Sequence, residues 1–148
     1  MDDATLKTFV DVVLGFFMET TGERVSMGVP YVKRERSPLL EYTGIIGISG
    51  ARRGGLYITA SAALLGDLSS LVSGAAVEDE EGLADAAGEV ANMIAGNARR
   101  DFGSDFMISV PIVVKGAPED ILLRLRPPVF IIPVTWRTHY AYLAVGIE

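Results

Sequence analysis

A stripe of polar side chains follows one side of a predicted helix in the second half of the chain. It comprises Asp85, Glu89 and Asn92, and Gly96 extends it by one turn. At about 100° per residue these positions lie within about 60° of arc, pointing to solvent or to a partner. The amide of an asparagine can donate and accept hydrogen bonds without ionising. A merely solvated helix face is the alternative, although asparagine is a poor mid-helix residue and solubility alone does not require it.

An apolar stripe on the opposite side of the same helix predicts how the polar stripe is presented. The helix is expected to begin after the acidic run 78–81, because negative charge favours a helix N-terminus, and to end at about Phe102, before Gly103. The apolar stripe must face the core, which turns the polar stripe outward. Its members are Leu83, Ala87, Val90, Ile94 and Ala98. The many glycines and alanines of this helix permit either the close approach of a partner backbone or tight internal packing.

Two further helices and several strands are expected to position this helix. An amphipathic helix is predicted over residues 3–21, and Ser61 is placed to cap a short helix that Gly74 ends. The segments expected to be extended are 25–36, 42–49, 55–60, 107–115, 129–137 and 140–147. Pro30 in the first of these indicates a sheet edge or a bulge. An irregular passage through Pro118 precedes the last two strands.

The order of these elements repeats along the chain. A helix followed by three strands occurs twice, and a shift of 81 positions superposes several residues that begin, break or end elements. The shift places Gly15 on Gly96, Gly22 on Gly103, Val29 on Val110, Pro30 on Pro111 and Val32 on Val113. We therefore predict one domain over residues 1–148 built from two pseudo-repeats, about 3–60 and 80–148. Long amphipathic helices with largely antiparallel strands indicate an α+β fold in which the helices pack on the sheet.

The polar stripe, together with this repeat, resembles the signature of the CheC and CheX phosphatases. That signature is an Asp or Ser, a Glu four residues on, an Asn three residues beyond and a downstream Pro. Here the first three are Asp85, Glu89 and Asn92, and Pro111 follows at a shorter spacing than in the family, so it is given no working role. The run 88–97, GEVANMIAGN, is the specific part of the resemblance, which extends over essentially the whole chain.

The first predicted helix lacks the pair of Glu and Asn residues that the helix of the second repeat carries. At the 81-residue shift Glu89 falls on Thr8 and Asn92 on Asp11. CheC-like proteins can carry two such helices, whereas CheX-like proteins carry one, on the second helix. The chain therefore resembles CheX.

The resemblance implies a phosphatase that acts on the aspartyl phosphate of a CheY-like response regulator. In this interpretation Glu89 and Asn92 are the catalytic pair, because Asn92 orients the attacking water and Glu89 docks on the regulator's lysine. Asp85 and Gly96 would belong to the partner-binding surface. The resemblance implies that the regulator supplies Mg²⁺, so no cofactor or metal of the chain's own is expected. It also implies a homodimer that pairs through sheet edges.

Two other functions stay open on the sequence. The same fold could bind a response regulator or a flagellar-switch component without hydrolysing anything, although an adaptor has no need of an amide one turn from a carboxylate. A structural homodimer whose polar stripe is idle is the other possibility.

Composition excludes several classes of protein. A net charge of −6 argues against nucleic-acid binding, and the absence of cysteine excludes disulfides and thiol catalysis. The acidic N-terminus and the lack of a long apolar stretch predict a cytoplasmic protein that does not insert into a membrane. The single histidine, His139, is expected in a tight turn at 138–139 between the last two strands, as an ordinary surface residue.

Overall fold

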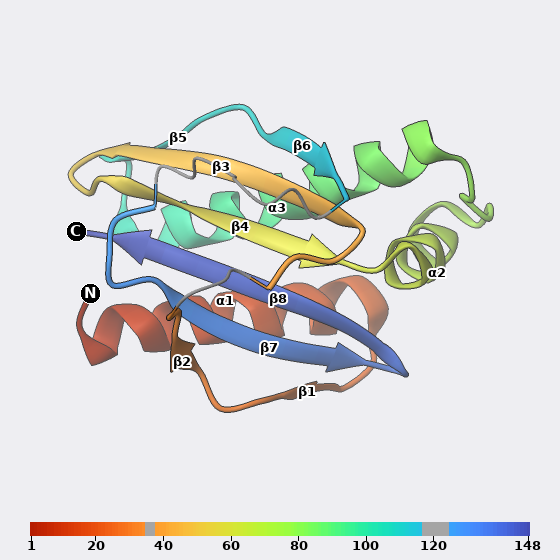
Figure 1. Ribbon diagram of the computed structural model, residues 1–148, viewed down its shortest axis with the longest axis horizontal. Helices are drawn as coiled ribbons and strands as arrows, with labels where there is room; N and C mark the ends of the chain where they lie inside the picture. Colours follow the sequence, from red (N-terminus) through yellow and green to blue (C-terminus); the bar gives the residue numbers. More distant parts are fainter. Residues whose placement is uncertain (35–37, 117–124) are drawn as a thin grey trace.

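The computed structural model describes residues 1–34, 38–116 and 125–148, which form helices packed on an antiparallel sheet (Figure 1). The helices are α1 (Asp3–Thr21), α2 (Ala62–Ser73) and α3 (Glu80–Phe102). The strands are β1 (Val25–Met27), β2 (Tyr31–Val32), β3 (Tyr42–Gly50), β4 (Gly54–Ala60), β5 (Phe106–Ile108), β6 (Ile112–Lys115), β7 (Phe130–Trp136) and β8 (His139–Ile147). The predicted α+β class is confirmed.

The helices begin and end where local chemistry predicts. The Ser61 hydroxyl accepts a hydrogen bond from the Leu64 amide at 3.1 Å and so caps α2. Both α1 and α2 end at a glycine in the left-handed conformation, Gly22 with φ +69° and Gly74 with φ +76°. α3 begins at Glu80, inside the acidic run, whereas it was predicted to begin after residue 81.

The order of strands shows the internal repeat directly. The sheet runs β1-β7-β8-β4-β3-β5, with β2 also paired to β7 and β6 to β3. The first half of this order, β1-β7-β8, corresponds to β5-β3-β4 in the second half. Read from either end, the sheet therefore has the same order of equivalent strands. The two halves meet where β4 pairs antiparallel with β8, and Tyr57 opposite Ala144 lies at the centre of that pairing. The helix-plus-three-strand repeat is therefore confirmed, while the extent of one domain over 1–148 stays a prediction.

The first strand of each repeat is interrupted, which corrects the prediction of continuous strands over 25–36 and 107–115. Residues 28–30 separate β1 from β2, and 109–111 separate β5 from β6. Each interruption ends with a proline, Pro30 or Pro111, which has no N–H to give to a strand pairing. Both interruptions lie at a sheet edge, as predicted for Pro30. Pairing of two copies through such an edge stays a prediction, and Arg36 and Pro118 lie outside the described residues.

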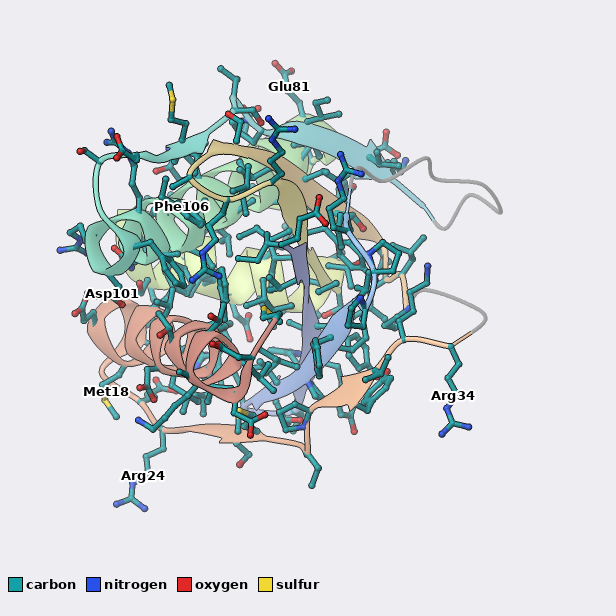
Figure 2. The ribbon with its side chains drawn as sticks, turned by 90° about the vertical axis from the view of Figure 1, so that its left-hand side faces the viewer. Met18, Arg24, Arg34, Glu81, Asp101 and Phe106 are labelled. Carbon is teal, nitrogen blue, oxygen red and sulfur yellow. The ribbon has the colours of Figure 1, made fainter. Side chains whose placement is uncertain are left out.

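The main core lies between one face of the sheet and the helices. Viewed at right angles to the first view, α1 and α3 lie on the same side of the sheet (Figure 2). Aromatic rings join them, because Phe9 of α1 and Phe102 of α3 have centroids 5.5 Å apart. A smaller cluster containing Tyr57, Ile131 and Ala144 lies apart from this core.

The last hairpin turns one residue earlier than expected. Trp136 pairs with His139, so the two-residue turn is Arg137–Thr138 and His139 begins β8. The His139 side chain is only 16% exposed, and its Nε2 lies 2.6 Å from Oδ2 of Asp67 in α2. The prediction of an ordinary surface histidine is therefore wrong, because a contact with a distant helix partly covers it.

Candidate functional site

The two stripes predicted for α3 lie on opposite sides of the helix. Asp85, Glu89 and Asn92 are exposed, and Gly96 is half-buried. The residues of the apolar stripe, Leu83, Ala87, Val90, Ile94 and Ala98, are all buried. The predicted orientation of α3 is confirmed, whereas the roles of the four polar-stripe positions stay a prediction.

Small residues bring α3 very close to the sheet. A Cβ added at Gly44 of β3 would lie 2.7 Å from the backbone oxygen of Ala87 and 2.8 Å from the Cβ of Ala91. Gly88 is likewise buried, and a Cβ there would lie 3.1 Å from Val113 of β6. Tight internal packing therefore accounts for these three small residues of α3. The sequence left this choice open because it does not show which strand lies under the helix.

The side chains of the polar stripe have no partners within the described part of the chain. The side chains of Asp85, Glu89 and Asn92 make no hydrogen bond or ion pair with another described residue. By contrast, Asn97 on the same helix accepts a hydrogen bond from Arg100. A Cβ added at Gly96 would meet nothing within 4 Å. The stripe is therefore free to contact another molecule.

An ion pair fixes the N-terminal end of α3 to the sheet. Lys115 of β6 donates a hydrogen bond to Glu80 in the first turn of the helix. This hydrogen bond raises the pKa of the Lys115 ammonium. Figure 1 shows this end of α3 beside α2. The polar stripe therefore starts at the end of α3 that contacts both β6 and α2.

A groove flanks the polar stripe on the side of β5 and β6. Its walls are α3, from Asp85 to Asn92, and the interruption 109–111. Ser109 fixes that interruption to β3: its hydroxyl accepts a hydrogen bond from the Gly47 amide at 2.8 Å, and its own amide donates to the Gly47 carbonyl oxygen at 2.9 Å. Val110 consequently projects from the sheet edge and is 83% exposed. Sequence reasoning missed Ser109, because its partner lies 62 residues away.

A second groove flanks the stripe on the side of α1 and α2. Asp85 and Glu89 line this groove too, together with Met93 and with apolar and hydroxyl-bearing residues of the other two helices. The helices that form it were predicted, but their approach to one another was not.

The arrangement suits a site that is completed by a second molecule. The carboxylates and the amide lie on the outer side of a helix between two open grooves. Among the described residues, no group of three or more His, Cys, Asp or Glu side chains could hold a metal ion. No helix in the same part of the chain is long and apolar enough to cross a membrane. An amide and a carboxylate presented this way can bind and orient groups in a partner's site.

Comparison with known proteins agrees with this arrangement. The family model for the chemotaxis phosphatase CheX matches residues 42–135, a span that includes all of α3. No curated protein matches the chain.

Solved structures extend the similarity to the whole fold. A CheC-like superfamily protein from Shewanella sp. PV-4 is 27% identical with a TM-score of 0.85, and covers 100% of this chain and 99% of its own. A chemotaxis protein CheX from Desulfovibrio desulfuricans is 26% identical with a TM-score of 0.83, covering 98% and 99%. CheX from Borrelia burgdorferi, solved in a complex with CheY, BeF3 and Mg²⁺, is 19% identical with a TM-score of 0.78 and covers 97% of each chain.

Proposed function

The chain belongs to the family of the chemotaxis phosphatase CheX, and on that premise we propose that it dephosphorylates the aspartyl phosphate of a CheY-like response regulator. The observation that carries the proposal is the exposed polar stripe of α3, in which Glu89 and Asn92 have no partner among the described residues. The Borrelia burgdorferi complex with CheY supports a partner of this class.

Asn92 is assigned the task of orienting water. Hydrolysis of an aspartyl phosphate requires a water in line with the phosphorus, and the bond from phosphorus to the aspartate oxygen breaks to give inorganic phosphate and free aspartate. The Asn92 amide oxygen would accept a hydrogen bond from that water, while the amide N–H remains available to a phosphoryl oxygen. The amide does not ionise, so its contribution comes from positioning and not from proton transfer.

Glu89 is assigned the task of docking. It lies about 4.5 Å along the helix axis from Asn92, nearly one turn away and on the same face. Its carboxylate would pair with a lysine beside the regulator's phosphoaspartate and so fix the distance from Asn92 to the phosphorus. Asp85 lies one turn further and extends the acidic part of the contact. Mg²⁺ bound by the regulator would neutralise charge on the phosphoryl group.

The test is the decay of phosphorylated CheY-like regulators from the same genome, measured in excess Mg²⁺ with wild type and with Asn92→Ala. We expect wild type to accelerate decay and Asn92→Ala to lose about 100-fold of that acceleration while it still binds the regulator. Asn97→Ala is a matched control, because Asn97 lies on the same helix and bonds to Arg100. It should retain the wild-type rate.

The other outcomes separate the remaining functions. If the wild-type chain binds a regulator without accelerating decay, it is a non-catalytic binding module. If it binds none of the regulators, the polar stripe is a solvated face and the proposal is wrong.

A further inference from the structure

The groove between α1, α2 and α3 has an apolar floor, and two apolar side chains stand exposed at its rim. Phe16, Leu68 and Val90, one from each helix, line it and are 2%, 4% and 6% exposed. Val72 and Met93 stand at the rim and are 68% and 42% exposed. Apolar side chains this exposed next to a concave surface gain free energy when a partner covers them.

We infer that this groove is the apolar half of the surface that docks the response regulator, and that Val72 and Met93 determine which regulator binds. The inference rests on the proposed function and adds a second set of contacts between the chain and the regulator. These contacts lie outside the Glu89–Asn92 pair and involve a different helix, α2.

Exposed ion pairs are weak, so tight binding of the regulator needs a second set of contacts. Asp85 and Glu89 are exposed, so pairing them with a lysine contributes little net free energy and is screened by salt. Stable interfaces depend on a few apolar side chains that become fully buried, with charged groups around them. The polar stripe therefore provides orientation, and neighbouring apolar side chains must provide most of the affinity.

The groove is continuous with the polar stripe. Asp85 and Glu89 form part of its lining, and Met93 lies one turn beyond Glu89 and next to Asn92. A regulator that places its phosphoryl group at Asn92 and its lysine at Glu89 must therefore lie against Met93.

The charge of the groove also indicates its occupant. The lining contains two carboxylates and neither lysine nor arginine. It is complementary to an apolar side chain that has a basic group beside it. A regulator that pairs a lysine with Glu89 brings a basic group to this groove, so the same molecule can occupy both parts of the surface.

The groove beside β5 and β6 is the competing location. It is also next to Glu89 and Asn92, and Val110 at its edge is more exposed than Val72. However, Val110 projects from the interrupted edge of the sheet, whereas Val72 faces a floor formed by three helices. Apolar anchors contribute most in well-packed pockets of this second kind.

The experiment measures affinity for the regulator loaded with BeF3 and Mg²⁺, a stable substitute for its phosphorylated form. The variants are Val72→Gln and Met93→Gln, which remove apolar surface, add no charge and keep good helix formers. Matched controls are Val110→Gln in the competing groove and Val29→Gln, which is 86% exposed at the opposite edge of the sheet. Decay of the phosphorylated regulator is measured in parallel at saturating concentrations.

We expect Val72→Gln and Met93→Gln each to raise the Kd about tenfold, with the rate of decay at saturation unchanged. Val29→Gln should bind like wild type. If both groove variants bind like wild type while Asn92→Ala still abolishes acceleration, the inference is wrong and the proposed function stands. A loss of affinity confined to Val110→Gln would also overturn it, because the apolar contact would then lie beside β5 and β6. If wild type neither binds nor accelerates decay, both proposals fail.

Discussion

Arg137 and Glu23 form a bidentate ion pair between the last hairpin and the segment that follows α1. Arg137 Nε donates to Glu23 Oε1 at 2.9 Å, and Nη2 donates to Oε2 at 2.8 Å. The indole N–H of Trp136 also donates to Oε1, at 3.2 Å. Arg137 has φ +57°, an uncommon conformation for a residue other than glycine, and its guanidinium stacks on the Trp136 ring. The pair thus holds the β7–β8 turn against α1.

This ion pair predicts a pH dependence of stability. The hydrogen bonds from Arg137, and then its charge, hold the pKa of Glu23 below its ordinary value of about 4.3. A carboxyl with a lowered pKa stabilises the folded state above the unfolded-state pKa, and that contribution is lost as pH falls through the folded-state pKa. We therefore expect wild type to be more stable than Glu23→Gln at pH 7, and the difference to shrink below about pH 4.3. Urea denaturation of both proteins across that range measures it. A difference that does not change with pH would show that the charge of Glu23 is not responsible.

His139 and Asp67 are expected to stabilise the attachment of α2 to the sheet. Their side chains share a hydrogen bond of 2.6 Å, and His139 is mostly covered. A double-mutant cycle with Asp67→Ala, His139→Ala and the double variant should give a coupling free energy of about 1 kcal/mol. Thermal or urea unfolding provides the measurement. Additive effects of the two single changes would mean that the contact contributes nothing to stability.

Gly44→Ala is expected to destabilise the protein by about 1 to 3 kcal/mol. The added methyl group would meet backbone of α3 at Ala87, which cannot yield as a flexible side chain does. Gly47→Ala on the same strand is the control, because its Cβ would lie 3.5 Å from the Ser109 hydroxyl, an ordinary contact. Equal stability of the two variants, measured by urea unfolding, would contradict the close approach of α3 to β3.

Gly96→Trp is expected to weaken regulator binding by at least about tenfold through a steric clash, without unfolding the chain. Nothing lies within 4 Å of a Cβ at Gly96, so a large side chain would occupy the space the partner needs. Gly15 lies at the corresponding position of α1 and is equally open. Gly15→Trp makes the same change in a helix that lacks the Glu and Asn pair, and it should bind like wild type. Equal affinities for the two variants would place Gly96 outside the interface.

Features set by neighbouring residues could be predicted from the sequence. The ends of α2 follow from Ser61 and Gly74, whose effects reach only three or four residues along the chain. The outward direction of Glu89 and Asn92 follows from helical periodicity, because the apolar stripe opposite them must be buried. The repeat was predictable because the order of predicted elements recurs and a shift of 81 positions places Pro30 on Pro111.

Features that depend on distant contacts could not be predicted. The partner of His139 is Asp67, 72 residues earlier, and no local pattern connects them. The closeness of α3 to β3 depends on Gly44, which lies 36 positions before the start of that helix. The groove bordered by Val72 and Met93 exists only when three helices come together. Periodicity specifies which side of a helix is buried but not which elements cover it.

The close packing of Ala87 and Ala91 of α3 on Gly44 of β3 has a thermodynamic consequence for any partner. A helix in such contact with the sheet leaves its backbone little freedom to lose, so binding would order chiefly the side chains of Glu89, Asn92 and Met93. The conformational entropy cost on this side of the interface is then small, and more of the contact free energy appears as affinity. The chain would thus act as a rigid template, and any large loss of entropy on association would come from ordering of the partner and from water immobilised at the interface.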